Sequence, residues 1–427
     1  MINKLKGNLL VQNTMWMLLG LGGKTVLQLG YFVIIARSLG VDDYGVFTGV
    51  VALALILSPF SNLGLGHTLV KKVSRDKQQF NKQWGKTLFV TVFLGFVLSI
   101  LFVGISQLLW TSKVSLTVIL LIALAELIFA KVVEVSGQAF QAINKMKLTA
   151  QFQLIISLNR FISAIILYLL VSNNELTYWA ILYCLSTCIT AIYSFVMVTK
   201  KIGTPVCDLQ GLIDDIKEGF FFSLNISFIT IQNDIDKTML SKFSTFQATG
   251  IYAAAYRLIE AAFMPMRSLI NASYTSFFAF GKDGIKKLFK YSLKFYLISL
   301  CYGVAIGTFL YLFAPFVPIV LGDAYESTIV AIQYLAIIPL IKGVQYFLSN
   351  TLTCSGNHLF RTCCQISSAI LNVCLCFYLI PEYSWLGAVI ATVVCEVLLI
   401  ILLGSNIIYL IVKESKGTKK QKFYNIS

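Results

Sequence analysis

Long apolar runs recur along the whole chain, and short polar gaps separate them. A helix that spans a membrane needs about 20 mostly apolar residues, because lipid cannot hydrogen-bond the backbone and each amide must be satisfied within the segment. Runs of this kind predict twelve transmembrane helices, at 11–36, 44–70, 86–110, 114–140, 148–171, 175–199, 218–241, 248–276, 289–313, 327–354, 359–380 and 386–412. No polar gap is long enough for a soluble domain. We therefore expect an all-α integral membrane protein.

Composition and charge support this interpretation and give the chain a direction in the membrane. Hydrophobic residues make up 57% of the chain and charged residues 12%, about half the charged fraction of a soluble domain. With both termini in the cytoplasm, 23 basic residues fall in inner segments, and the outer loops hold only Arg37, Lys113 and Lys242. Basic residues gather on the cytoplasmic side, so we expect a multi-pass protein of a bacterial-type cytoplasmic membrane. The net charge of +15 then reflects contact with anionic lipid, and we expect no nucleic acid partner.

The twelve predicted spans divide into two similar halves of six. A small glycine-aromatic turn around Gly45 precedes Pro59 in the second span, and a similar turn around Gly250 precedes Pro265 in the eighth. Each turn is predicted to open a helix that proline breaks about four turns later. Because six is even, both halves enter from the same side, as a parallel repeat. The predicted parts are an N-terminal lobe (1–200), a cytoplasmic linker (201–217), a C-terminal lobe (218–412) and a basic cytoplasmic tail (413–427).

Charged residues inside the spans carry the functional signal, because each costs about 2.5–3.5 kcal/mol near the bilayer centre. They should face the interior of the bundle or a water-filled cavity. The cations are Lys24, Lys131, Arg160, Lys237, Arg257, Arg267, Lys294 and Lys342. The anions are Glu126, Glu134, Asp234, Asp236, Glu260 and Glu396.

Several of these charges are spaced to pair on one helix face. Asp234 and Lys237 are three residues apart, as are Arg257 and Glu260, and Arg267 returns to nearly the face of Glu260. Such pairs have two interpretations, a structural one and a role in binding a coupling proton or sodium ion. The residues left open between the two are Asp234, Asp236, Lys237, Glu260, Glu126, Glu134 and Glu396.

Other cations have no acidic neighbour on their own helix and favour an anionic ligand. Lys24 shares a helix face with Gln28, while Arg160 and Lys342 need partners from other helices or from a ligand. Guanidinium and ammonium groups bind phosphate well where water is scarce. The candidate substrate-binding residues are Lys24, Arg257, Arg267, Arg160, Lys342 and Gln28.

A family resemblance follows the same order along both halves. The stretches that carry it are Ala36-Arg37-Ser38-Leu39-Gly40, Tyr44-Gly45-Val46-Phe47, Asn62-Leu63-Gly64-Leu65-Gly66, Lys71-Lys72, Asp234-Ile235-Asp236-Lys237-Thr238-Met239-Leu240, Gly250-Ile251-Tyr252 and Tyr256-Arg257. They resemble bacterial Wzx-type flippases, the polysaccharide transport branch of the multidrug/oligosaccharidyl-lipid/polysaccharide (MOP) exporter superfamily. The resemblance covers nearly the whole chain.

This resemblance implies two six-helix lobes around a V-shaped cavity that works by alternating access. The implied cargo is an undecaprenyl-pyrophosphate-linked oligosaccharide that moves to the outer leaflet for a surface polysaccharide such as O-antigen or capsule. Cations on the first and eighth spans would hold the pyrophosphate, here Lys24 and Arg257, with Arg267 as a further match. The implied partners are this glycan lipid, membrane lipids and the polysaccharide polymerase machinery. No cofactor is implied, and we expect a carrier rather than an enzyme.

Two other functions stay open. A drug or cation antiporter of the same superfamily predicts a cavity dominated by acids, whereas this chain has eight cations to six anions within its spans. A membrane glycan polymerase needs catalytic carboxylates, and Asp42-Asp43 is the one acidic pair of that kind, although the pair also fits a helix-capping turn before Tyr44. The chain has no GxxxxGK[ST] phosphate loop. Energy would therefore come from a proton or sodium gradient, or from downstream consumption of the product.

Overall fold

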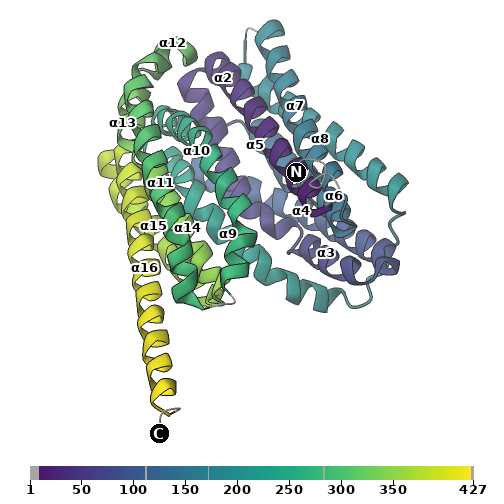
Figure 1. The fold of residues 1–427 in the computed structure, drawn as a ribbon. Helices are drawn as coiled ribbons and strands as arrows, with labels where there is room; N and C mark the ends of the chain where they lie inside the picture. The colour runs from purple at the N-terminus through teal and green to yellow at the C-terminus, as the bar shows by residue number, and fades with distance from the viewer. Residues whose placement is uncertain (1–8, 111–112, 172, 282–283, 425–427) are drawn as a thin grey trace. The chain divides into compact units, whose positions relative to one another are not determined.

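A computed structural model describes residues 9–110, 113–171, 173–281 and 284–424 (Figure 1). Helices make up nearly all of these residues, and no strand occurs among them. The expected all-α membrane fold is therefore confirmed. Lys4, Lys6 and Lys282 of the predicted inner cations lie outside the described residues, as do the side chains of the tail lysines from residue 416 onward.

The chain packs as two compact units. The first comprises Met1–Ala253 with the short segment Ile319–Ala324, and the second comprises Ala254–Pro318 and Tyr325–Ser427. Eleven described helices lie wholly in the first unit. They are α2 (Leu9–Leu57), η1 (Ser58–Ser61), α3 (Leu65–Arg75), η2 (Lys77–Gln79), α4 (Phe80–Trp110), α5 (Leu116–Leu124), η3 (Ala125–Phe129), α6 (Ala130–Ala142), α7 (Met146–Leu170), α8 (Glu175–Lys201) and α9 (Leu212–Phe243).

The first two predicted spans form one helix with a kink, which corrects the predicted loop around Gly45. α2 continues through this region, and only Gly40 departs from helical geometry, with φ 72° and ψ 175°. Residues with a Cβ essentially never adopt that combination, so a single glycine makes the bend. Asp42 and Asp43 lie in the first turn after it. Acidic side chains stabilise the start of a helix, in line with the capping interpretation.

The predicted break near Pro59 is present. α2 ends at Leu57, and Ser58–Ser61 form a short 3₁₀ turn with the proline in its first residues. Gly64, with a positive φ of 71°, then starts α3. The predicted span 44–70 is therefore two helices, because proline removes a backbone donor and Gly64 resets the chain direction.

The core of the first unit lies where α3, α4, α6, α7 and α8 meet. Trp84, Phe140 and Phe152 are fully buried there, and Phe140 stacks at an angle against Phe152 with 5.6 Å between the ring centroids. Large aromatic side chains bury more area than any others. This core fixes the backbone that carries the charged groups described below.

α9 belongs to the first unit by packing, although the sequence prediction placed 218–241 in a C-terminal lobe. It contacts α2, η1, α3 and α4. The non-helical connection before it is also shorter than the predicted linker 201–217, because α8 extends to Lys201 and α9 begins at Leu212. The predicted division of the chain into two functional lobes stays a prediction.

The second unit contains the remaining helices, and α10 crosses from the first unit into it at Ala253–Ala254. The helices are α10 (Phe246–Gly281), α11 (Ile285–Phe313), η4 (Ala314–Phe316), α12 (Val317–Leu321), η5 (Asp323–Tyr325), α13 (Thr328–Leu335), α14 (Ile338–Cys354), α15 (His358–Tyr383) and α16 (Trp385–Tyr424). α12 and η5 lie partly in the short segment 319–324 that clusters with the first unit. α16 extends well into the predicted basic tail.

The predicted break at Pro265 is wrong. α10 runs through it as one helix, although proline cannot donate the backbone hydrogen bond expected at that point. One turn away, the Tyr302 hydroxyl donates to the carbonyl oxygen of Ala262 at 2.5 Å. The carbonyl that Pro265 leaves without a backbone donor is that of Ala261, and the tyrosine bonds the neighbouring carbonyl.

Nine helical runs among the described residues are long and apolar enough to cross a membrane. The difference from twelve has a physical origin. One run, Gly22–Ser61, joins the first two predicted spans through the kink, and the charged helices α9 and α10 are absent from the nine. The count of twelve crossings stays a prediction.

Candidate functional site

Lys24 lies on the face of α2 that packs against α7. Its ammonium group donates a 2.8 Å hydrogen bond to Oε1 of Gln153 on α7. Gly20 and Gly23 bring the two helices together, since a Cβ on either glycine would lie 2.7 Å from a side-chain carbon of α7. Small residues allow this close approach in membranes. Lys24 and Gln28 are both half-buried, so both side chains remain partly accessible to a ligand.

Arg160, two turns beyond Gln153 on α7, lies in a buried cluster that draws on three membrane segments. Its guanidinium donates to Oε1 of Glu126 at 2.8 Å and to the Thr187 hydroxyl at 3.3 Å. The Tyr183 hydroxyl donates to the same carboxylate oxygen, and the guanidinium carbon lies 4.0 Å from the centre of the Tyr183 ring. The partner of Arg160 from another helix is therefore Glu126.

Glu126 lies in a single π-helical turn, η3, between α5 and α6. Such a turn inserts one residue into a helix and changes the direction of the side chains that follow; it occurs often at functional sites. Here it places a carboxylate that is only 5% exposed in contact with α7 and α8. Sequence periodicity could not have found this turn, because the apolar pattern of the span continues through it.

Two further carboxylates of the first unit pair within their own helices. Asp234 lies 2.5 Å from the Lys237 ammonium on α9, the predicted pair. Glu134 lies 2.7 Å from Lys131 on α6, a pair of the same spacing that the sequence prediction did not propose. The neighbouring Asp236 is buried and accepts hydrogen bonds from the Tyr252 hydroxyl and from the backbone amide of Lys237.

A second buried cluster lies wholly within the second unit. Lys342 on α14 donates to the Tyr256 hydroxyl on α10 at 2.5 Å, and its ammonium lies 4.0 Å from Oε1 of Glu396 on α16. Lys342 and Glu396 are both less than a tenth exposed. Oε2 of Glu396 is buried and has no hydrogen-bond partner among the described residues. The cation again finds its partners on other helices.

Arg257 and Arg267 on α10 are both half-buried. The Arg257 guanidinium lies 3.9 Å from Oε2 of Glu260, the predicted pair, a distance beyond that of a hydrogen bond. Arg267 lies two helical turns beyond Glu260 on the same helix. α10 therefore carries two half-buried guanidinium groups within the second unit.

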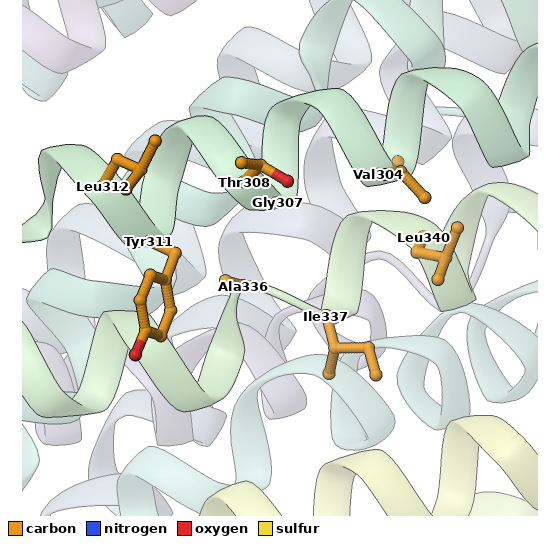
Figure 2. Close-up of a pocket in the computed structure, with 9 residues that line it drawn as sticks. Val304, Gly307, Thr308, Tyr311, Leu312, Ala336, Ile337 and Leu340 are labelled. Atoms are coloured by element: carbon orange, nitrogen blue, oxygen red, sulfur yellow. The ribbon is translucent and has the colours of Figure 1, made fainter.

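Within the second unit, an apolar groove of about 330 Å³ lies between α11 and the break that separates α13 from α14. Figure 2 shows Val304, Thr308 and Tyr311 on one side and Ala336, Ile337 and Leu340 on the other. None of its lining residues is charged. The groove therefore fits a hydrocarbon chain and is not a site for a charged headgroup.

Comparison with known proteins supplies the family and the fold. The model of the polysaccharide biosynthesis protein family matches residues 10–278. A search of curated proteins found no match. A multidrug resistance MATE family transporter of the MOP superfamily, solved in an inward-facing conformation, is similar in structure with a TM-score of 0.72 and 17% identity, over 91% of this chain and 95% of that chain.

Two other solved structures are similar over nearly the whole chain. A MOP superfamily transporter from Pyrococcus furiosus has a TM-score of 0.64 and 15% identity, over 93% of this chain and 96% of that chain. An outward-facing multidrug resistance MATE family transporter has a TM-score of 0.60 and 16% identity, over 95% of this chain and 97% of that chain. The chain belongs to the polysaccharide biosynthesis protein family, and it has the fold of MOP superfamily transporters.

Proposed function

We propose that this protein is a flippase that moves an undecaprenyl-pyrophosphate-linked oligosaccharide from the cytoplasmic to the outer leaflet of a bacterial cytoplasmic membrane. Family membership supports a role in polysaccharide biosynthesis, and the MOP fold supports transport. The choice of an anionic lipid as cargo depends on the charges at membrane depth. The proposal includes no covalent chemistry on the cargo.

The observation that carries the proposal is that nearly all the predicted intramembrane carboxylates have a basic side chain close by. Five of the six predicted intramembrane carboxylates lie within 4.0 Å of a basic side chain, and the sixth accepts two hydrogen bonds. A site for an organic cation needs unneutralised acid, because bringing a cation out of water is costly without an opposite charge. These carboxylates leave little negative charge for a cationic drug.

Three basic side chains also favour an anionic cargo. The Lys24 ammonium donates a hydrogen bond to the neutral side-chain amide of Gln153. Arg257 and Arg267 are half-buried guanidinium groups on α10. Guanidinium donors fit phosphate oxygens in pairs, and lysine acts as a point charge. We propose that these three side chains hold the pyrophosphate, while the sugars stay hydrated and the polyprenyl tail stays in lipid.

The test neutralises Lys24 and Arg257 together, as Lys24→Gln and Arg257→Gln, in cells that depend on this protein for their surface glycan. We expect glycan export to fall by at least about tenfold at normal protein levels, because charge-assisted hydrogen bonds are worth about 1.5–3 kcal/mol each. Lys294→Gln is the matched control, since Lys294 is an exposed cation on α11 that lies 4.2 Å from the Tyr291 ring. Normal export by the double variant would exclude the proposed pyrophosphate site.

A drug or cation antiporter is the second candidate, and the fold favours it directly, because multidrug resistance MATE transporters share it. The solved Pyrococcus furiosus transporter is reported to have a binding pocket of reverse polarity that suggests a different function for that protein, so the fold alone does not choose the cargo. A drug-sensitivity panel distinguishes the two. Increased sensitivity to several cationic drugs on deletion, with intact surface glycan, would favour the antiporter.

A further inference from the structure

Arg361, in the first turn of α15, carries a guanidinium group whose hydrogen-bond partners among the described residues are all neutral. Nη1 donates to the Thr353 hydroxyl of α14 at 2.7 Å, and Nε and Nη2 lie 3.4 Å from Oε1 of Gln365. In the described part of the chain no carboxylate pairs with this half-buried arginine. Because a guanidinium that is partly removed from water is stabilised by an opposite charge, Arg361 retains the capacity to bind an anion.

The face of α14 that meets Arg361 offers further donors. Tyr346, Asn350 and Thr353 follow one another at spacings of four and three residues, so they share this face. The Tyr346 phenol interacts electrostatically with Arg361. Asn350 is 8% exposed, and its Nδ2 is buried without a hydrogen-bond partner among the described residues. These groups suit an anion, because each can donate a hydrogen bond and none carries a negative charge.

α10 contributes a third group to this region. The Tyr274 phenol, exposed on α10, interacts electrostatically with Arg361. A Cβ at Gly281 would overlap the carbonyl oxygen of Cys354, so the ends of α10 and α14 are in direct contact. Arg267 precedes Tyr274 by seven residues on the same face of α10, about 10 Å further along the helix axis. The region around Arg361 is therefore continuous with a guanidinium that we propose to bind the pyrophosphate.

Positive charge gathers at the same end of the second unit, which the predicted topology places at the inner surface. Three exposed lysines lie in the first two turns of α11, at Lys286, Lys287 and Lys290. This end of α11 is close to α15, because Ile285 and Cys364 belong to one buried cluster. The Glu414 carboxylate of α16 accepts from the backbone amide of Lys286 at 3.1 Å, so it bonds the start of α11. A basic surface of this kind raises the local concentration of anions.

Exposed apolar side chains lie beside these donors. In the first turn of α15, Leu359 is 73% exposed and Phe360 is 40% exposed. Phe278 of α10 is 44% exposed and packs against Tyr274 with 5.0 Å between the ring centroids. Apolar side chains that stay exposed together mark contact with lipid or with an apolar ligand. Since a guanidinium can bond two phosphate oxygens at once, the combination suits a phosphate headgroup that carries a hydrocarbon chain.

We propose that Arg361, together with Tyr274 and Tyr346, forms a loading site that binds the pyrophosphate headgroup of the cargo at the inner surface. The inference rests on the proposed flippase function and adds a site outside the residues assigned to the headgroup above. All three side chains belong to the second unit. The headgroup binds here first and then passes along α10 to Arg267. No bond in the cargo forms or breaks at this site.

Binding of undecaprenyl pyrophosphate to the purified full-length protein in detergent tests the site. We expect Arg361→Gln to raise the dissociation constant by about tenfold, because charge-assisted hydrogen bonds to phosphate are lost. Arg75→Gln is the matched control and should bind as the unaltered protein does, since Arg75 is an exposed arginine in the last turn of α3, in the first unit. Equal dissociation constants for these two variants would exclude the loading site.

A conservative variant keeps the test valid if Arg361→Gln does not fold. Arg361→Lys keeps the charge and loses the planar fork of donors. We expect its affinity for undecaprenyl pyrophosphate to fall between those of the unaltered protein and the glutamine variant. Unaltered affinity in Arg361→Lys, with the thermal unfolding midpoint unchanged, would contradict recognition of the headgroup by the guanidinium.

Membrane phospholipids also carry phosphate, so a second arm separates them from the cargo. The protein is placed in phosphatidylcholine nanodiscs that contain either undecaprenyl pyrophosphate or phosphatidylglycerol, and native mass spectrometry measures the bound lipid. We expect Arg361→Gln to lose undecaprenyl pyrophosphate and to keep phosphatidylglycerol. Equal loss of both lipids would assign Arg361 to bulk lipid and overturn the loading role. Inorganic pyrophosphate that binds as tightly as the lipid-linked form would overturn it as well.

Transport kinetics keep this inference separate from the proposed function. In proteoliposomes with a fluorescent polyprenyl-pyrophosphate oligosaccharide, we expect Arg361→Gln to raise KM about tenfold and to leave kcat within about twofold, because loading precedes the carrying step. A lower kcat with an unchanged KM would contradict a loading role. A protein that moves no lipid-linked glycan, but whose binding of undecaprenyl pyrophosphate depends on Arg361, would contradict the proposed function and leave the binding site supported.

Discussion

The two units each bury a cation, a glutamate and a tyrosine, but they bond them differently. In the first unit, Arg160 and Tyr183 both donate to one oxygen of Glu126, and the guanidinium lies over the tyrosine ring. In the second unit, Lys342 donates to Tyr256 and lies 4.0 Å from Glu396, whose Oε2 has no hydrogen-bond partner in the described part of the chain.

This difference follows from the chemistry of the two cations. A guanidinium offers five donors in a plane and can bond a carboxylate and a hydroxyl while it stacks on a ring, whereas an ammonium is a compact point charge. In the arginine cluster two donors bond the carboxylate, although Nε of Arg160 is buried without a partner among the described residues. In the lysine cluster the carboxylate itself keeps a buried oxygen without one. We call the first cluster closed and the second open on this ground. We infer that the first cluster mainly holds the fold, and that the second has bonding capacity left for a proton, an ion or water.

The largest effect should come from breaking the closed cluster. Arg160→Met leaves the Glu126 carboxylate buried without its main partner, and loss of one partner of a buried ion pair costs about 3–5 kcal/mol. We expect a large drop in the thermal unfolding midpoint of the purified protein in detergent. Lys294→Met, which removes an exposed cation, is the control. Equal midpoints for these two variants would show that the first cluster is not structural.

Removing the tyrosine hydroxyl should destabilise the open cluster more than the closed one. Tyr256→Phe removes the acceptor of the 2.5 Å bond from Lys342, whose ammonium lies 4.0 Å from Glu396, so we expect a loss of about 1.5–3 kcal/mol. Tyr183→Phe should cost about 1 kcal/mol, because Glu126 keeps its bond from Arg160. Urea or thermal unfolding of both variants measures the difference. A larger loss for Tyr183→Phe would reverse the comparison.

Neutralising the open cluster should cost less still. Glu396→Gln removes a buried charge whose second oxygen has no partner among the described groups, and relief of desolvation offsets the lost attraction to Lys342. We expect stability to change by about 1 kcal/mol or less. Transport should fall if this carboxylate takes part in coupling, and its dependence on a proton or sodium gradient should then be lost. Unfolding of the variant at room temperature would instead assign Glu396 a structural role.

The smallest effect should come from the exposed pair between Lys82 and Asp208. Lys82 lowers the pKa of this carboxyl, so any stabilisation is present at neutral pH and disappears as the pH falls below about 4, the ordinary carboxyl range. Lys82→Gln should leave the unfolding midpoint at pH 7 and physiological salt unchanged within error. A clear drop at pH 7 would show that exposed pairs support the fold here as much as buried ones.

The fold class was readable from the sequence because apolar length and the absence of long polar gaps allow little else in a membrane. Pairs within one helix were partly readable, since the three-residue spacing of Asp234 and Lys237 fixes their proximity, although the same spacing of Lys131 and Glu134 was not used. Partners on other helices were not. Nothing in the local sequence of Arg160 points to Glu126, which lies 34 residues earlier and depends on a π-helical turn.

The position of α9 was the least predictable feature. Its sequence resembles the predicted start of a second half, and that resemblance led to its predicted place in a C-terminal lobe. Its packing depends on contacts between residues far apart in the chain, such as those of Ser223 with Pro59 and of Asp215 with Lys86. Such contacts between distant residues cannot be read from the local sequence of α9.

The kink at Gly40 has a consequence for how the protein enters the membrane. Because the turn between the first two predicted spans occupies one residue, no hydrophilic loop has to be carried across with this hairpin in the proposed orientation. The only charged side chains near the bend are Arg37, Asp42 and Asp43. The helical pair can insert as one unit at low cost, and the first outer connection offers no room for an epitope tag or a protease site.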